Sequence, residues 1–175
     1  RILNLSTRED FFKSYITTYL EKDVRQFIEV RSLTAFRNFL SLVALRTGQE
    51  LHYEDLANAC GIDTRTVKQW ISILSTSGLI LLLEPYLANA SRRIIKAPKL
   101  YFMDTGLCAY LCGWPNAEML EKSAMAEAFF ETFVVTEIIK NYQAANLDYA
   151  NTLFYYRDID QKEIALLYVK ERTIT

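Results

Sequence analysis

The spacing of apolar positions predicts two helices at the start of the chain. Between residues 7 and 29, apolar side chains recur every three or four positions, as on one wide helix face. A second helix is expected from residues 32 to 47, ending at Gly48. We interpret residues 1–48 as a helical lead-in whose large apolar faces need a partner to cover them.

The next segment, residues 49–113, has the pattern of a winged helix. A short helix, a three-residue turn with glycine and a second helix follow one another, which is the signature of a helix-turn-helix. These elements are expected at residues 52–60, 61–63 and 65–77. The spacing then becomes strand-like, and it predicts a hairpin with a basic tip followed by a short helix. These are expected at residues 79–84, 98–103 and 105–112.

Residues 114–175 are predicted to form a small α/β module. Two helices and two closing strands are expected at residues 117–122, 123–145, 152–157 and 163–170. The expected fold class is therefore α+β and mostly helical. A module that ends after two strands would leave a sheet edge open for pairing with another copy.

Composition and charge narrow the possible functions. The chain has 175 residues, of which 51% are hydrophobic, enough for a real core. With 20 Lys and Arg against 21 Asp and Glu, no global positive field attracts nucleic acid, so any such activity needs a local patch. The longest apolar run, Leu79 to Leu83, is too short for a bilayer span, and no membrane partner is expected. A chain that opens at Arg1 is expected to be a fragment or a processed protein.

The cysteines and glycines predict no cofactor in this chain. Three Cys in 175 residues are typical of free thiols in a cytoplasmic protein. Cys108 and Cys112 lie one helical turn apart, but His52 is the only His, so a four-ligand zinc site lacks ligands and core packing is favoured. No G-x-x-x-x-G-K-[ST] loop is present, which excludes a Walker-type ATP site in these residues.

Candidate DNA-binding residues lie on the second helix of the helix-turn-helix and on the hairpin. Arg and Gln can make bidentate contacts with base edges, and short hydroxyl side chains can contact phosphates. The candidates are Thr64, Arg65, Lys68, Gln69, Ser72, Arg92, Arg93, Lys96 and Lys99. Residues 51–103 contain six Lys and Arg against four Asp and Glu, a local net charge of +2. The alternative is a winged helix that makes protein contacts or serves as a spacer.

Acidic residues of the last module suggest a metal-dependent nuclease as a further alternative. Such an enzyme needs two or three carboxylates converging on Mg²⁺, usually with a Lys. The carboxylates available are Glu131, Glu137, Asp158, Asp160 and Glu163. From spacing alone, these carboxylates are interpreted as solvated surface charges. Trp70 is interpreted as core or rim packing, with stacking in a groove as the alternative, and His52 as a surface residue.

Several sequence strings resemble the C-terminal region of prokaryotic AAA-type ATP-binding proteins. They are Tyr19-Leu20-x-x-Asp23, Thr66-Val67-Lys68, Pro85-Tyr86, Arg93-x-x-Lys96-x-Pro98-Lys99-x-Tyr101-Phe102-x-Asp104-Thr105-Gly106-Leu107, Phe130-Glu131-x-Phe133-Val134 and Tyr155-Tyr156-Arg157. The resemblance implies a winged helix followed by a module similar to PD-(D/E)xK nucleases. It also implies that ATP and Mg²⁺ would bind to a domain upstream of this region and not to these residues.

The nuclease-like pattern is incomplete in this chain. By resemblance Glu131 matches the helix carboxylate, but Ala165 stands where the family's strand Asp is expected. The Glu-x-Lys strand would lie beyond Thr175, and Glu127 stands where the family commonly has Gly. Glu131 is therefore a remnant candidate, and no catalytic or metal site is expected. The predicted function is a non-catalytic segment that binds double-stranded DNA or regulates an ATPase, with subunit assembly through the apolar helices as the alternative.

Overall fold

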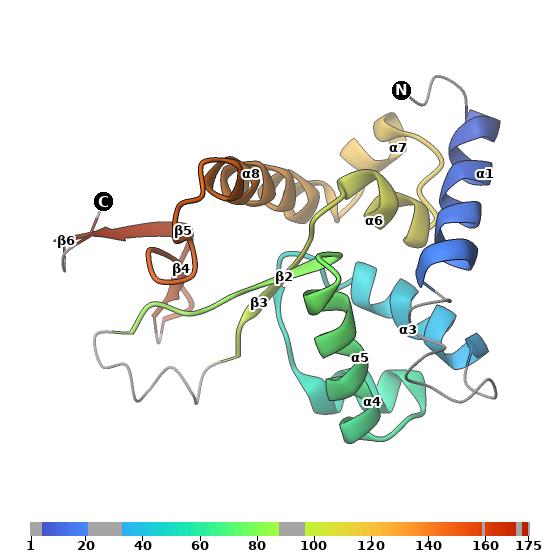
Figure 1. The fold of residues 1–175 in the computed structure, drawn as a ribbon, viewed down its shortest axis with the longest axis horizontal. Helices are drawn as coiled ribbons and strands as arrows, with labels where there is room; N and C mark the ends of the chain where they lie inside the picture. The colour runs from blue at the N-terminus through green and yellow to red at the C-terminus, as the bar shows by residue number, and fades with distance from the viewer. Residues whose placement is uncertain (1–4, 21–32, 88–96, 159, 171–172, 175) are drawn as a thin grey trace.

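The computed structural model describes residues 5–20, 33–87, 97–158, 160–170 and 173–174. Within these ranges the protein is a mixed α+β structure with small antiparallel sheets, and Figure 1 shows the helices gathered at one end and the last strands at the other. In the same ranges, no helix combines the length and apolar character that crossing a bilayer requires.

The lead-in helices cover one side of the first core. α1 (Leu5–Tyr15) continues as a π-helical turn, Ile16–Leu20, and α3 spans Leu33–Ala44. The rest of the first predicted helix, residues 21–29, lies outside the described residues. Phe12 packs beside Tyr110, and the inner face of α3 is completely buried. These two helices therefore complete the core of the segment that follows.

The predicted helix-turn-helix segment is helical where expected. α4 (Tyr53–Cys60) and α5 (Thr64–Thr76) are joined by Gly61-Ile62-Asp63. Gly61 has a φ of 66° and ends α4 in the left-handed conformation that glycine adopts without steric cost. The turn is therefore fixed by local sequence.

The hairpin supplies two strands of a three-stranded sheet, with β3 (Lys99–Phe102) at its centre. β2 (Ile80–Leu83) and β3 pair antiparallel, with Ile80 opposite Phe102. A strand of two residues, β1 (Gln49–Glu50), pairs with the other edge of β3, and the hydrophobic pattern does not predict it. The sheet order is β1-β3-β2.

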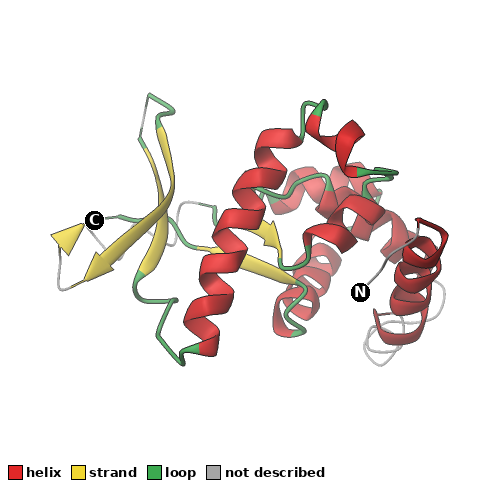
Figure 2. Ribbon diagram, turned by 90° about the horizontal axis from the view of Figure 1, so that it is seen from above, coloured by secondary structure: helices red, strands yellow, loops and turns green. Residues whose placement is uncertain are grey.

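The last part of the chain contributes a long helix and a second sheet. The elements are α6 (Thr105–Leu111), α7 (Ala117–Glu121), α8 (Ala126–Ala144), β4 (Leu153–Arg157), β5 (Glu163–Lys170) and β6 (Thr173–Ile174). The antiparallel order is β4-β5-β6, so a short third strand, which the sequence did not predict, pairs with β5. In Figure 2, α8 stands between this sheet and the other helices.

The hairpin of β2 and β3 is shared by two hydrophobic cores. Ile80 and Leu100 face the first core, which contains α3, α4, α5 and α6. Leu81, Leu83 and Tyr101 face the second core, with α8 and β4. Because successive strand residues point to opposite faces, apolar residues at every position of β2 are explained by burial on both sides.

A buried hydrogen-bond chain fastens α8 to the first sheet. The Phe102 N–H donates to Thr47 Oγ1 at 3.2 Å, and the hydroxyls of Thr47 and Thr132 lie 2.9 Å apart. Because the single proton of Thr132 goes to the Ala128 carbonyl at 2.7 Å, Thr47 donates to Thr132. Gly48, beside Thr47, has a φ of 75°, a left-handed conformation that glycine adopts without steric cost.

Candidate functional site

α5 presents one buried and one exposed face. Its buried side chains pack beneath it, with Trp70 edge-on against Phe36 and Phe39 at ring-centroid distances of 5.2 and 5.0 Å. The interpretation of Trp70 as a core residue is confirmed. The helix begins at a strong cap, because the Thr66 N–H and hydroxyl donate to the Asp63 carboxylate at 2.9 and 2.6 Å. These hydrogen bonds lower the pKa of Asp63.

The opposite side of α5 carries four of the predicted DNA-binding residues. Arg65, Lys68, Gln69 and Ser72 are exposed and follow the spacing i, i+3, i+4, i+7, so they lie on one face. We call these four residues the outer face of α5. Thr64 is half-buried at the first position of the helix, and α5 has no acidic residue.

Lys68 is also held against the neighbouring helix. Its Nζ lies 5.6 Å from the centre of the Tyr53 ring on α4. An exposed cation–π contact of this kind contributes about 0.5–1 kcal/mol, so it orients the lysine without removing it from solvent. Burial raises the pKa of Tyr53, and the charge of Glu84 adds to this effect.

The predicted hairpin cations do not all join this surface. Arg92, Arg93 and Lys96 lie outside the described residues. The prediction that Lys99 contacts DNA is wrong, because its side chain is only 3% exposed and is enclosed by carboxylates. Lys99 lies on a strand whose two faces both pack against other elements, which sequence spacing did not reveal.

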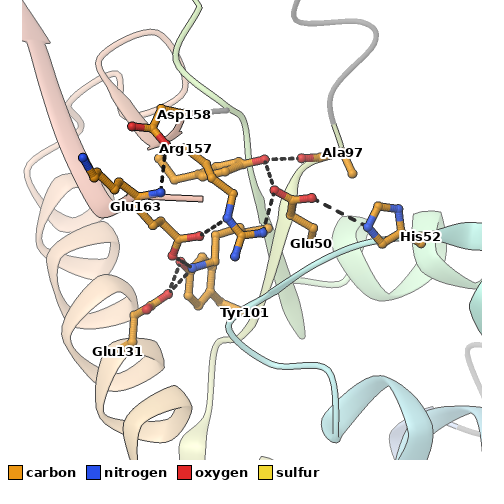
Figure 3. Close-up of polar contacts among 11 residues, drawn as sticks. Glu50, His52, Ala97, Tyr101, Glu131, Arg157, Asp158 and Glu163 are labelled. Atoms are coloured by element: carbon orange, nitrogen blue, oxygen red, sulfur yellow. Dashed lines mark hydrogen bonds and ion pairs between the residues drawn. The ribbon is translucent and has the colours of Figure 1, made fainter. Parts of the chain in front are cut away.

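Lys99 is the centre of a charged group between the two sheets, which we call the Lys99 cluster. Its members are Glu50, Lys99, Tyr101, Glu131, Tyr155, Arg157 and Glu163. Lys99 Nζ donates to Glu131 at 2.6 Å and to Glu163. Figure 3 shows the carboxylates of Glu131 and Glu163, from α8 and β5, turned toward the same point. Three elements far apart in sequence therefore meet at one ammonium group.

Further hydrogen bonds and ion pairs extend the cluster. Tyr101 donates its hydroxyl to Glu131 at 2.7 Å, while Arg157 pairs with Glu50 at 3.2 Å and with Glu163 at 3.3 Å. Burial, followed by the charge of Glu131, raises the pKa of Tyr101. Burial and the charge of Glu50 raise the pKa of Tyr155. Both phenols therefore stay protonated at neutral pH.

This arrangement brings together only part of the predicted acidic group. Glu137 pairs with Lys140 on the exposed side of α8, and Asp158 accepts from the Lys162 N–H within its turn. Glu131 and Glu163 do converge, although the surface interpretation was favoured for both. Glu50 and Arg157 were missed, since nothing in their local sequence indicates that side chains of β1 and β4, which belong to different sheets, meet.

The cluster lines an open cavity of about 420 Å³ between β1, α8 and β5. Its carboxylates already face Lys99 and Arg157, and no group of three or more His, Cys, Asp and Glu in the described part of the chain is arranged to hold a metal ion. Ala165, on β5, supplies no ligand. The arrangement is that of a paired ion cluster that joins β3 to α8 and β5.

The single histidine lies at the rim of the same cavity. His52 is exposed, as predicted, with Nε2 3.6 Å from Glu50 Oε2. The three cysteines are free thiols. Cys108 is buried on α6 and Cys112 is half-buried at its end, consistent with a packing role.

Comparison with known proteins gives the family but no activity. The chain is 29% identical over 152 residues to an uncharacterized protein of Mycobacterium bovis and, equally, to one of Mycobacterium tuberculosis. Each match covers 87% of this chain and 33% of the relative, so the chain spans about a third of their length. No solved structure matches it. Residues 2–118 match the sequence profile of a domain of unknown function, DUF8612, and the chain therefore belongs to this family.

Proposed function

We propose that this chain is a non-catalytic DNA-binding segment in which α4, α5 and the β2–β3 hairpin act as a winged helix. The observation that carries the proposal is the outer face of α5, where Arg65, Lys68, Gln69 and Ser72 are exposed together at helical spacing. This is the face that a recognition helix turns toward a duplex.

The dimensions and chemistry of this face suit a major groove. Seven residues of helix rise about 10 Å, and an α-helix fits the groove, which is about 12 Å wide. Arg65 can make a bidentate contact with guanine and Gln69 with adenine, while Lys68 can neutralise a phosphate. The buried side of α5 holds the backbone rigid, which favours a fixed set of contacts.

Charge determines how strong such binding can be. The outer face offers two cations. For each phosphate that a protein neutralises, the logarithm of the binding constant falls by about 0.9 for every tenfold rise in salt concentration. Because Arg65 is assigned to a base edge and only Lys68 to a phosphate, these residues alone predict a slope near −0.9 and weak binding. Arg92, Arg93 and Lys96, which the proposal does not require, would make the slope steeper.

Fluorescence anisotropy with a labelled duplex, titrated with salt, tests this proposal. We expect Lys68→Met to weaken binding and to reduce the slope by about 0.9, because one phosphate contact is lost. Arg65→Ala should weaken binding and relax base preference. Lys13→Met, an exposed lysine on α1, is the matched control and should change neither quantity. Absence of binding at about 50 mM salt, or equal effects of the two lysine variants, would refute the proposal.

We further propose that the segment belongs to an AAA-type ATP-binding protein of the reducing cytoplasm. The sequence strings given above support this, and three free thiols agree with a reducing compartment. The mycobacterial relatives are about three times longer than the matched region, which leaves room for another domain. A G-x-x-x-x-G-K-[ST] loop in the unmatched part of those relatives is expected, and its absence would count against the proposal.

A second candidate function is subunit assembly through the outer side of α8. Phe130 and Phe133 are 71% and 51% exposed, and they border an apolar groove of about 450 Å³ beside α6 and α7. Exposed aromatic side chains of this kind mark protein contacts. Light scattering of Phe130→Glu should show loss of concentration-dependent self-association. Leu147→Glu, 55% exposed outside this groove, is the control and should still self-associate.

A further inference from the structure

A small cavity between α1, the end of α5 and the start of α6 lies outside the regions described above. Its volume is about 170 Å³, and its lining is mostly aromatic and apolar. The side chains that the following argument uses are Phe11, Phe12, Tyr15, Met103, Asp104 and Leu107. Pockets for drug-sized ligands usually measure about 300–1,000 Å³, so this cavity has room only for a small molecule or a head group.

Three aromatic rings of α1 form one wall of the cavity. Phe11 lies edge-on to Phe12 at a ring-centroid distance of 5.3 Å, and its plane is within 14° of the plane of Tyr15 at 6.4 Å. Phe12 is buried against Tyr110, which fixes its ring, whereas Phe11 is 50% exposed. The face of an aromatic ring carries negative partial charge, so a wall of such rings attracts a cation.

A carboxylate lies beside this aromatic wall. A Cβ at Gly106 would be 3.0 Å from Asp104 Oδ1 and 3.2 Å from the Phe12 ring, so the carboxylate and the ring are neighbours. Asp104 Oδ1 accepts the Leu107 N–H at 2.9 Å and caps α6. Among the residues that the structure describes, no Lys or Arg forms an ion pair with Asp104. Its negative charge is therefore available to a ligand.

The lining determines which kind of cation fits. A primary ammonium group has three N–H donors, and each needs an acceptor once water is removed. A quaternary ammonium group has no N–H, so it suits a mostly apolar cavity, and proteins recognise it with aromatic rings. We propose that this cavity binds the quaternary ammonium group of a small molecule of the choline class. The proposal is independent of DNA binding, because the cavity reaches α5 only at its C-terminal end, beyond the outer face.

The methyl signals of isotope-labelled methionine in the nuclear magnetic resonance spectrum provide the readout. Met103 lines the cavity, whereas Met119 lies on α7 and Met125 directly precedes α8. We expect choline, titrated at constant ionic strength, to shift the Met103 signal until it saturates and to leave the other two unchanged. The uncharged isostere of choline, in which carbon replaces nitrogen, should bind more weakly, because the rings and Asp104 attract only the charged form.

Two variants test the two parts of the site. Phe11→Leu keeps an apolar side chain but removes a ring, and it should weaken choline binding about fivefold, the effect of one cation–π contact. Asp104→Asn keeps a residue that caps α6 and removes the charge, so it should also weaken binding. Phe130→Leu, the same change at an exposed ring of α8, is the matched control and should bind choline as the native chain does.

Phosphatidylcholine vesicles carry the same group on a lipid surface. Co-sedimentation with them that is lost in Phe11→Leu would identify a lipid head group as the source, and a response to choline alone would identify a free molecule. Asp104→Asn decides the test if Phe11→Leu does not fold. The proposal would be overturned by an unmoved Met103 signal, by equal affinity for choline and its isostere, or by native affinity in Asp104→Asn. Equal effects of Phe11→Leu and Phe130→Leu would overturn it as well.

Discussion

The outer face of α5 and the Lys99 cluster contain the same kinds of charged side chain in opposite environments. Lys68 is exposed, with one weak contact to an aromatic ring. Lys99 is 3% exposed, and its ammonium group lies between two carboxylates that are each 22% exposed. The two lysines therefore differ in the free-energy cost of removing their charges from water and in their availability to a binding partner.

This difference follows from the solvation of charge. A buried ammonium group is tolerated only when opposite charges and hydrogen bonds replace its water, and here Glu131 and Glu163 do so. An exposed lysine keeps its water and can exchange part of it for a phosphate. We infer that the cluster maintains the structure while the outer face remains available to a partner.

The largest expected effect comes from removing the buried charge. Lys99→Met keeps most of the side-chain volume but leaves Glu131 and Glu163 without their shared cation, so we expect a loss of about 3 kcal/mol in the free energy of unfolding. Lys68→Met, the same change on the outer face, should lower it by no more than about 1 kcal/mol, the size of the cation–π contact with Tyr53. Urea unfolding measures both. Equal effects would show that the Lys99 charge has no special role.

A double-mutant cycle isolates the pair within the cluster. Glu131→Gln should lower the free energy of unfolding by less in the Lys99→Met background than in the native chain, with a coupling energy of about 1–2 kcal/mol. In that background the Glu131 carboxylate has already lost its cation, so removing its charge is less harmful. The same cycle between Lys68 and Glu131 should give a coupling near zero. Additive effects in the first cycle would contradict the ion pair.

Removing a neutral hydrogen bond in the same region should lower the free energy of unfolding by less than removing the Lys99 charge. Thr132→Val removes the acceptor for the buried Thr47 hydroxyl, and we expect a loss of about 1 kcal/mol in the free energy of unfolding. Thr136→Val is the matched control, since Thr136 is equally buried but its hydroxyl bonds only to carbonyls of its own helix. A cost at Thr136 equal to that at Thr132 would contradict the role given to the hydrogen bond between Thr47 and Thr132.

The smallest effect is expected at the exposed cap of α5. The pKa of Asp63 is lowered from its ordinary value of 3.8 by the hydrogen bonds from Thr66, so its charged form is favoured in the folded state. Its contribution to stability is therefore complete above the ordinary pKa and is lost as pH falls through the lowered value.

Unfolding curves at several pH values measure this contribution. The difference in stability between the native chain and Asp63→Ala should shrink as pH falls through the acid range. Asp63→Asn keeps a cap without a titrating group, so its difference from Asp63→Ala should not depend on pH. A constant difference for the native chain would contradict the assigned cause.

The local parts of the fold could be predicted because they depend on neighbouring residues. The capping of α5 by Asp63 and the turn at Gly61 follow from residue types within a few positions of one another. The two strands β2 and β3 were predicted from the apolar spacing within each strand. For the same reason Arg65, Lys68, Gln69 and Ser72 were placed correctly on one exposed face.

The contacts that were missed connect distant segments. Lys99 meets Glu131 across 32 positions and Glu163 across 64, and Glu50 meets Arg157 across 107. Helical or strand spacing carries no information at such separations. The sequence alone determined which side chains share the outer face of α5, because periodicity is a property of one helix. Only the tertiary structure decided that Lys99 is a buried partner of carboxylates, because burial depends on which elements pack on both sides of a strand.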